Sequence, residues 1–574
     1  MIRELSDLGK KIRTSNSEKI IIHNALKEEP VSIDLVIDAD GCFKGFICYE
    51  KKMTTAEAIT AKKGKARLLL DKAEEVLGYG GDGKKHRLFL DKLALYEDVT
   101  ELKPVFAFYS KNKTGVEKAR DDFERSVPEK GRTGNISFRI ANSDIRIHEE
   151  PAVYQRIISL YEQAQKGKIN SNSKLCSICG RRDYPVEDVP HGMIKRVPDG
   201  QTSGCALVSY NCDAFESYGL EGNVNSSICT NCSRTYVEGL NWLMQNGSIV
   251  SDEKGKERLK YSNRKNFGSD TAIVFWTREN TLLEELDQLE EPNPQEVNAL
   301  IESVVSGKDK SVKYLEEDKF YSCSLSGVAA RIAIRDWMEM SLHDFRASIA
   351  KWFGDIRVQY RGDVYYSRLY NLARCCQNEK EDKDYTLSRV ASILWRCALK
   401  NTSPPLWVLS AVLKRSRLDG RGVTPERAAL IRLVLNRNNK GGMEMQEKLD
   451  VGNRTAAYTC GRIFAVLESV QRAALGKDIN AGIRERFFAF ASTNPSAAFG
   501  RLMKLSQNHL TKLKGEKPGL AVVLDKELQA LFKNIDAFQA VFSLEEQGQF
   551  SIGYYHQKEH QFNKTELKET VEEA

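Results

Sequence analysis

Two cysteine pairs constrain the fold of this chain more than any other feature of its sequence. The segment "LCSICG" at 175–180 contains Cys176 and Cys179, and "SSICTNC" at 226–232 contains Cys229 and Cys232. A two-residue spacer lets both thiolates of a pair reach one ion, and two such pairs complete a tetrahedral four-sulfur site of the kind that zinc prefers. The spacing therefore predicts an insertion at about 175–235 whose base is clipped by one zinc ion.

We expect this metal to have a structural role. Four protein thiolates leave no open position for water or substrate, which argues against catalysis by the ion. A redox-active dithiol is the alternative that the spacing leaves open.

Length and composition indicate a protein of several domains. A chain of 574 residues is longer than one hydrophobic core usually supports, so two to four domains are expected. No run approaches the roughly 20 apolar residues of a membrane span, and the first residues lack the apolar stretch of a signal peptide. We therefore expect a cytoplasmic protein with no membrane contact. Its thirteen cysteines, an odd number, are expected to be reduced thiols, four of them liganded.

Periodicity separates the chain into two parts. Alternating apolar residues around a turn at Asp40-Gly41 predict a β-hairpin within 32–50. A helix is predicted over 65–79, and strands over 105–110, 136–141, 271–277 and 330–337. Later segments have the helical period, as in Ile463, Leu467 and Val470. The sequence thus predicts an α+β N-terminal domain over 1–345, containing the zinc-clipped insertion, and an all-α C-terminal helical bundle over 346–574.

Charge is sorted unevenly within the helical part. Residues 389–440 contain eleven Lys or Arg against two acids, and residues 451–517 contain eleven against four. Beyond 518 there are five against ten. A basic face on a helical bundle is typical of sequence-independent contact with phosphate, because each neutralised phosphate releases condensed counterions. A solvated helix surface is the other interpretation of each such stretch.

Two loops carry further candidates for nucleic-acid contact. The segment at 202–225, within the insertion, is rich in small polar residues and glycine. This composition suits a recognition surface, although an ordinary polar loop has the same composition. The stretch "GYGGDGKK" at 78–85 lacks the Ser or Thr of a phosphate-binding P-loop and follows a helix, so nucleotide hydrolysis is not expected. Lys84 and Lys85 could instead touch phosphate from a glycine-rich loop, or the loop is a plain surface feature.

The sequence shows no recognisable set of catalytic residues. The pattern "HQKEH" at 556–560 fits a metallopeptidase motif, but it lies near a polar terminus without an identifiable third ligand. No nucleophile elbow, nuclease His-Asp pair or paired acids stand out. The sequence therefore predicts a binding protein and not an enzyme.

Several longer segments carry a family resemblance. The most specific is C-terminal, "AAYTCGRIFAVLESVQRAALGKDINAGIRERFFAFASTNPSAAFGRLMKLSQNHLTKLK", and others are "ALVSYNCDAFESYG", "IVFWT", "SGVAARIAIRDW", "PPLWVLSAVLKRSRLDG" and "KARLLLDKAEEVLGY". Along most of its length the chain resembles the large subunit of the type I-C CRISPR surveillance complex, Cascade. The complete set of four cysteines departs from that pattern, so the metal does not follow from the resemblance.

The resemblance implies a noncatalytic subunit of an RNA-guided complex. Such a subunit reads a protospacer-adjacent motif, aids opening of the duplex target DNA, holds the displaced non-target strand and recruits a helicase-nuclease, while guide pairing supplies the remaining specificity. Its partners would be the guide RNA, the backbone subunits, the target DNA and the helicase-nuclease.

The candidate DNA-binding residues follow from this resemblance. Polar loop side chains are expected to touch the duplex or its motif, and short amides and hydroxyls suit the acceptor-rich minor groove. The bundle cations are expected to contact the backbone of single-stranded DNA. The loop set is Ser203, Asn211, Ser217, Tyr218 and Asn225, and the bundle set is Arg415, Arg417, Arg421, Arg462, Arg484, Arg486, Lys504 and Lys512.

The resemblance also implies a small subunit made from the same gene. Lys440-Gly441-Gly442 can be encoded by a purine-rich run that resembles a ribosome-binding site, upstream of Met445. Initiation there would release residues 445–574 as a helical protein.

Two other functions compete with this one. The first is a zinc-containing protein that binds single-stranded DNA or RNA and is unrelated to CRISPR systems. Basic helices and a four-thiolate zinc site would suit such a protein equally well. The second is a metal-dependent nuclease, which would need carboxylates converging on a divalent ion that a cysteine site cannot supply.

Overall fold

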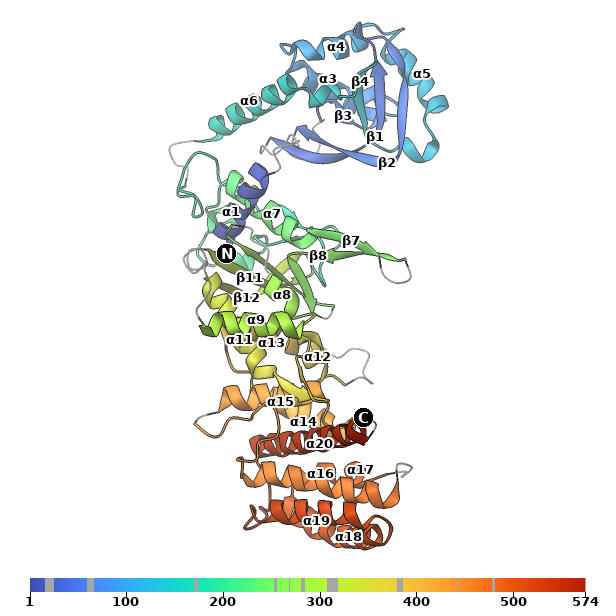
Figure 1. The fold of residues 1–574 in the computed structure, drawn as a ribbon. Coiled ribbons are helices and arrows are strands. Elements are labelled where there is room, and N and C mark those ends of the chain that lie inside the picture. The colour runs from blue at the N-terminus through green and yellow to red at the C-terminus, as the bar shows by residue number, and fades with distance from the viewer. Residues whose placement is uncertain are drawn as a thin grey trace. The chain divides into compact units, whose positions relative to one another are not determined.

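The computed structural model describes residues 1–15, 25–58, 67–169, 174–251, 255–267, 269–279, 284–306, 318–378, 386–439, 441–476 and 481–572 (Figure 1). Contacts divide the chain into two compact units. The first comprises Met1–Ile194 and Ala206–Trp242, and the second comprises Lys195–Cys205 and Leu243–Ala574. No helix in these described stretches is long and apolar enough to cross a membrane.

A four-stranded sheet in the order β2-β1-β4-β3 organises the first unit. The predicted hairpin is confirmed: β1 (Leu26–Ile37) pairs antiparallel with β2 (Phe43–Ala58). The backbone N–H groups of Asp40 and Cys42 both donate to the Asp38 carboxylate, which closes the turn. Strand β4 (Ile136–Ile140), also predicted, lies parallel to β1 and pairs with the short β3 (Leu70–Asp71).

Helices cover this sheet and share its core. Buried residues of the strands, such as Ile33 and Phe138, cluster with buried residues of the helices, such as Phe89, Phe108 and Phe123. The helices are α2 (Ala73–Leu77), α3 (Lys84–Ala94), α4 (Lys103–Ser110), α5 (Val116–Ser126) and α6 (Pro151–Lys168) (Figure 1).

Two of the predicted elements here need correction. The strand expected over 105–110 is wrong, because these residues belong to α4. Pro104 stands in the first turn of that helix, and Val105 and Phe108, three residues apart, bury the same face. A short apolar run does not distinguish helix from strand, and tertiary packing decided the outcome. The helix predicted over 65–79 is reduced to α2, because Leu70–Asp71 pairs with β4.

Two helices of the first unit cross at very close range. Helix α1 (Ile2–Ser15) packs on α7 (Thr230–Gln245), and a Cβ atom at Gly9 would lie 2.0 Å from the Thr235 carbonyl oxygen. The buried Ser6 and Thr235 hydroxyls are 2.7 Å apart, and Arg13 forms two 2.7 Å hydrogen bonds to the Glu238 carboxylate. These contacts fix the position of α7, which begins beside the cysteine cluster.

A second sheet and a set of helices share one core in the second unit. Strands β12, β11, β10 and β9 are adjacent in that order and antiparallel, and the strands predicted over 271–277 and 330–337 are confirmed as β10 and β12. One buried cluster joins Phe275 and Phe320 of the sheet to Phe345, Trp395 and helices that follow. The predicted domain boundary near 345 therefore falls inside a continuous core, whereas the contacts divide the chain elsewhere.

The remaining elements before residue 440 have the following bounds. The strands are β5 (Met193–Ile194), β6 (Cys205–Ala206), β7 (Gly247–Ser251), β8 (Glu257–Tyr261), β9 (Arg264–Phe267), β10 (Thr271–Thr277), β11 (Lys319–Val328), β12 (Arg331–Ser341), β13 (Val358–Tyr360) and β14 (Asp363–Tyr365). The helices are α8 (Glu284–Gln288), α9 (Pro294–Ser306), α11 (Leu342–Ile356), α12 (Leu369–Arg374), α13 (Thr386–Lys400), α14 (Leu406–Leu418) and α15 (Pro425–Asn438).

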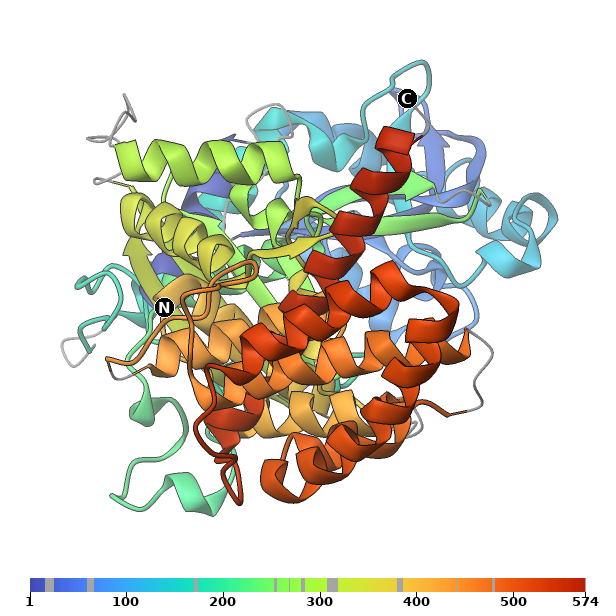
Figure 2. The same ribbon diagram turned by 60° about the horizontal axis from the view of Figure 1, so that its bottom comes forward.

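The predicted helical architecture is confirmed at the C-terminal end, whereas the all-α prediction over 346–574 is wrong at 358–365, where β13 (Val358–Tyr360) pairs with β14 (Asp363–Tyr365). The C-terminal end consists of α16 (Ala456–Leu475), α17 (Ile483–Ala491), α18 (Pro495–Glu516), α19 (Pro518–Phe532) and α20 (Leu544–Glu572), and Figure 2 shows the dark red α20 running alongside the orange helices. Helices α16 and α20 touch backbone to backbone. A Cβ atom at Gly461 would lie 2.0 Å from the Phe550 carbonyl oxygen, and one at Gly553 would lie 2.1 Å from the Tyr458 carbonyl oxygen.

Candidate metal centre and nucleic-acid-binding surfaces

The four predicted cysteine ligands come together in the first unit. Ligand atoms of Cys176, Cys179, Cys229 and Cys232 all lie within 4.8 Å of one another, and the Cys179 and Cys229 sulfurs are 4.0 Å apart. Tetrahedral zinc with Zn–S bonds of about 2.3 Å places its sulfurs about 3.8 Å apart. The cluster therefore has the donor set and nearly the size of a four-thiolate site, and it could hold a metal.

Local backbone structure shapes each half of the cluster. The Gly180 N–H donates to the Cys176 carbonyl oxygen at 2.9 Å, which closes the first turn, and Gly180 has a φ of 69° that suits glycine. Cys232 lies in the first turn of α7. Backbone N–H groups of Ile178 and Cys229 point at the Cys176 sulfur, at 3.4 and 3.3 Å. Such donors stabilise sulfur in its anionic, metal-binding form.

The pKa values of the thiols reflect this environment. Burial acts to raise the pKa of Cys176, but the backbone hydrogen bonds from Cys179, Cys229 and Ile178 outweigh it and lower that pKa to about 7. The side-chain hydrogen bond with Cys232, together with burial, raises the pKa of Cys229. The protein's own hydrogen bonds thus favour the metal-binding thiolate form of Cys176. The Cys229 thiol would lose its proton only when a metal cation binds.

The cluster joins segments far apart in the sequence. Ser177 N–H donates to the Ser227 carbonyl oxygen at 2.7 Å, and Thr230 N–H donates to the Pro185 carbonyl oxygen at 2.9 Å. A small apolar group around the sulfurs includes Ile228 and also Ile2 of α1. A metal here would therefore tie together the ends of the insertion, the start of α7 and the N-terminal helix.

The predicted recognition loop is divided between the two units. Ser203 belongs to the second unit, whereas Asn211, Ser217, Tyr218 and Asn225 belong to the first. The Ser217 hydroxyl donates to the Ala214 carbonyl oxygen at 3.2 Å, and the Asn225 amide donates to the Leu220 carbonyl oxygen at 2.7 Å. These two side chains shape their own loop. The Tyr218 side chain points outward and is 91% exposed.

The lysines of the glycine-rich loop have acidic neighbours. Lys84, the first residue of α3, is highly exposed and lies 3.0 Å from the Asp82 carboxylate. Lys85 lies 2.5 Å from Glu74. The nearby acids reduce the local positive charge that a phosphate would meet.

The eight predicted bundle cations do not share one environment. Arg462 is 8% exposed and donates to Gln557 at 2.9 Å, and Arg417 donates to Ser492 and Gln547. Burial lowers the pKa of both guanidinium groups. Arg415 donates to Asn378, and Arg484 donates to Glu485 and to the Gly420 carbonyl oxygen. These four side chains are engaged by neighbouring groups of the protein, and Arg484 also lines a cavity.

The other four cations are exposed or line a cavity. Arg486 of α17 is exposed, as are Lys504 and Lys512 of α18, although Lys512 lies 3.7 Å from Glu516. Helix α18 has no other acid, so its exposed face, which also carries Arg501, is strongly basic.

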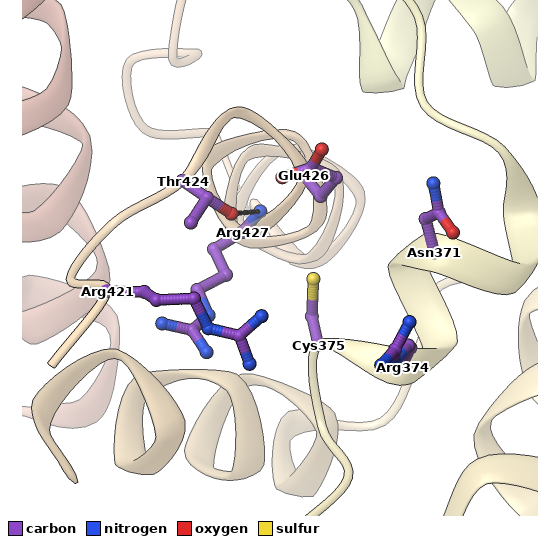
Figure 3. Close-up of a pocket in the computed structure, with 7 residues that line it drawn as sticks. All are labelled: Asn371, Arg374, Cys375, Arg421, Thr424, Glu426 and Arg427. Carbon is purple, nitrogen blue, oxygen red and sulfur yellow. Dashed lines mark hydrogen bonds between the residues drawn. The ribbon is translucent and has the colours of Figure 1, made fainter. Parts of the chain in front are cut away.

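Arg421 lines two cavities. The smaller, about 200 Å³, lies among α12, α15 and the loop before α15 (Figure 3). In Figure 3 the side chains of Arg421 and Arg427 lie side by side, and Cys375 points into the space between them and Arg374. Arg427 is held by the Asp419 carboxylate and the Gly422 carbonyl oxygen.

The larger cavity, about 440 Å³, is lined by the predicted Arg421 and Arg484 and also by residues that sequence analysis did not single out. It brings Tyr360 from β13 together with Arg472 from the last turn of α16 and with Lys558 of α20. These residues are about 110 and 85 positions apart, and no short motif connects them. Only the packing of the helices could reveal them.

The metallopeptidase motif has a structural explanation. The ring of His556 is buried, and its Nδ1 atom is 2.9 Å from the Tyr458 hydroxyl. Within the described ranges, the four cysteines are the only group of three or more His, Cys, Asp or Glu side chains found close enough to hold a metal.

The fold and the cysteine cluster define a class of protein. Its two units combine sheets and helices, its four cysteines could hold one metal ion, and one of its helices, α18, has an exposed basic face. The sequence matches a family model described as CRISPR-associated protein (Cas_Csd1) over residues 5–562. The chain therefore belongs to the Cas_Csd1 family of CRISPR-associated proteins. No curated protein matches its sequence.

Proposed function

We propose that this protein is the noncatalytic large subunit of a type I-C CRISPR surveillance complex. In this role it reads the protospacer-adjacent motif, aids duplex opening, holds the displaced strand and recruits the helicase-nuclease. The observation that carries the proposal is the family match over residues 5–562. It is supported by the exposed face of α18, where Arg501, Lys504 and Lys512 stand on a helix whose one acid is its last residue.

The resident metal in this proposal is zinc, held by Cys176, Cys179, Cys229 and Cys232. Zinc supplies folding energy and no reaction step, since four thiolates fill its coordination sphere. The protein acts in the cytoplasm, where thiols stay reduced.

Motif reading is tested by selection from a duplex library. The guide-loaded complex, with and without this subunit, is bound to a matched target flanked by randomised bases, and the bound DNA is sequenced. We expect one short flanking motif to be enriched only when the subunit is present, because guide pairing cannot read bases outside the target. Equal and unselective binding by both complexes would favour a general single-strand binder outside CRISPR and contradict the proposal.

The motif-reading surface in this proposal includes Tyr218. Its exposed ring is the most accessible large hydrophobic side chain of the predicted recognition loop at 202–225. In the same proposal Lys84 and Lys85 are only weak phosphate contacts, because Asp82 and Glu74 lie close to them.

We further propose that residues 445–574 are also produced as a separate small subunit. One buried cluster, which includes Phe464, Phe499 and Phe550, draws all its fully buried members from 457–554, so this piece carries a core of its own. Met445 is buried in the full chain and its N–H donates to Asn436 at 2.8 Å. Lys440, part of the codon run before Met445, lies outside the described residues.

The small subunit is tested by intact mass. Expression of the native gene with its own codons is expected to yield the full chain and a second protein that begins at Met445. A Met445→Leu codon change should remove the second protein and leave the full chain, because leucine retains an apolar side chain of similar volume at this buried position. Detection of the full chain alone from the unaltered gene would refute the internal start.

A further inference from the structure

The larger cavity of the second unit combines a stackable aromatic ring with three guanidinium groups, those of Arg421, Arg472 and Arg484. We propose that it binds one nucleotide of a single DNA strand, with Arg421 and Arg472 at the phosphate and Tyr360 against the base. This inference rests on the proposed function and adds to it a defined site for the displaced strand. The cavity volume of about 440 Å³ lies within the usual range for small-ligand sites, about 300–1,000 Å³.

Arg421 is held in place before any ligand arrives. It lies between Gly420 and Gly422, whose φ angles of 73° and 69° favour glycine. The Gly422 carbonyl oxygen accepts from Arg427 at 2.6 Å, and the Gly420 carbonyl oxygen accepts from Arg484 at 3.0 Å. The loop is therefore fixed from two sides, which lowers the entropy that binding would cost.

The acids near the cavity are already engaged. Glu468 accepts from the Tyr554 hydroxyl at 2.7 Å and pairs with Lys558 at 3.2 Å. Glu485 accepts from Arg484 and from the Gly482 N–H at 2.8 Å. Their charges are balanced by groups other than Arg421 and Arg472.

Arg421 and Arg472 both contribute positive charge to the lining of the cavity. Arg421 forms an ion pair with Asp419 at 3.6 Å, and it shares this carboxylate with Arg427, which bonds it twice. Arg472 is exposed and forms no ion pair with any described residue. Planar guanidinium groups bind phosphate oxygens in pairs, so two of them on one cavity suit a phosphodiester.

Tyr360 presents its ring from a rigid hairpin. Strands β13 and β14 are joined by Arg361 and Gly362, which have φ angles of 49° and 87°, as in a two-residue hairpin turn of type I′. The Arg361 N–H donates to Glu559 of α20 at 2.8 Å, which anchors the turn. Stacking of a base on an aromatic ring is worth about 1–3 kcal/mol in single-strand binding.

The cavity is lined by residues on both sides of Met445, the proposed first residue of the small subunit. Tyr360 and Arg421 precede this residue, whereas Arg472, Glu468 and Lys558 follow it. The full chain would therefore hold a nucleotide that a separate 445–574 protein could not.

The first test compares two charge-matched variants of the full chain. Binding of a fluorescent 15-nucleotide oligothymidylate is measured over a range of salt concentrations. Arg421→Ala/Arg472→Ala is expected to bind on the order of tenfold more weakly than Lys526→Ala/Lys533→Ala, which removes two exposed charges of the same bundle outside the cavity. The slope of log K against log salt should fall by about 0.7 more than in this control, because one phosphate contact is lost. Equal affinity and slope in the two variants would overturn the site.

The second test separates the ring from the fold. Tyr360→Leu is expected to weaken oligothymidylate binding about tenfold, and Tyr360→Phe, which keeps the ring, should bind like the native chain. Equal weakening by both changes would overturn the stacking role. Binding of free thymidine monophosphate as tight as that of the oligonucleotide would overturn assignment to a strand.

The two proposals fail in different ways. If the native chain binds the oligonucleotide and the complex selects a motif, but the cavity variants match their controls, only the nucleotide site is refuted. If the complex selects no motif and the native chain binds no single strand, the proposed function itself is refuted.

Discussion

Replacement of Cys229 by serine is expected to unfold much of the first unit and to release its metal. The native protein should contain one equivalent of zinc, and the C229S variant close to none. Apparent zinc binding contributes about 10–16 kcal/mol to the folding of small zinc-dependent peptides, so loss of one thiolate should lower the free energy of unfolding by several kcal/mol. The effect should extend to α1, since Ile2 packs beside the cluster.

Thermal unfolding and metal analysis by mass spectrometry measure this result. Cys212→Ser is the matched control, because Cys212 is exposed, lies in the same insertion and is outside the cluster. This control should retain the metal and the native unfolding temperature. Unchanged metal content and stability in C229S would refute a shared four-cysteine site. A chelator should reproduce the C229S effect in the native chain and have no further effect on C229S.

The second large effect is expected at the crossing of α16 and α20. Gly461→Ala should destabilise the second unit by at least about 1–3 kcal/mol, because the new methyl group would meet the Phe550 carbonyl oxygen at 2.0 Å and force the helices apart. Gly500→Ala is the matched control on α18. A Cβ atom there meets nothing within 4 Å, so it should stabilise the helix by about 0.5–1 kcal/mol.

Urea unfolding of the two variants measures the difference. Opposite shifts of the transition midpoint are expected, since both changes add the same methyl group to a helix and only one adds it at a backbone contact. Shifts of the same sign and size would mean that α16 and α20 do not cross at Gly461.

The cysteine cluster was predictable because its information is local. Two-residue spacers place thiolates on one ion whatever the rest of the chain does. Only the structure shows that Ile2 packs against the cluster and that Ser177 and Ser227 join its two halves. These contacts link residues about 50 to 230 positions apart, for which the sequence contains no periodic signal.

The bundle cations show where sequence reasoning ended. Charge counting identified a basic region, but Arg462 and Lys504 contribute to that count equally. The structure buries Arg462 against Gln557 and exposes Lys504, because each position on a helix faces either a neighbour or solvent. The predicted cations thus fall into two groups, one engaged by neighbouring groups of the protein and one that is exposed or lines a cavity.

The sequence by itself determined the elements whose signal lies within a few neighbouring residues. These are the hairpin around Asp38, the two cysteine pairs and the buried face of α16 that includes Ile463 and Val470. Tertiary structure decided the rest. It made the apolar run of α4 a helix, gave the sheet and the following helices one core, and gathered Tyr360, Arg421 and Arg472 on one cavity. The physical reason is that periodicity records which side of an element is buried, whereas only packing determines what covers it.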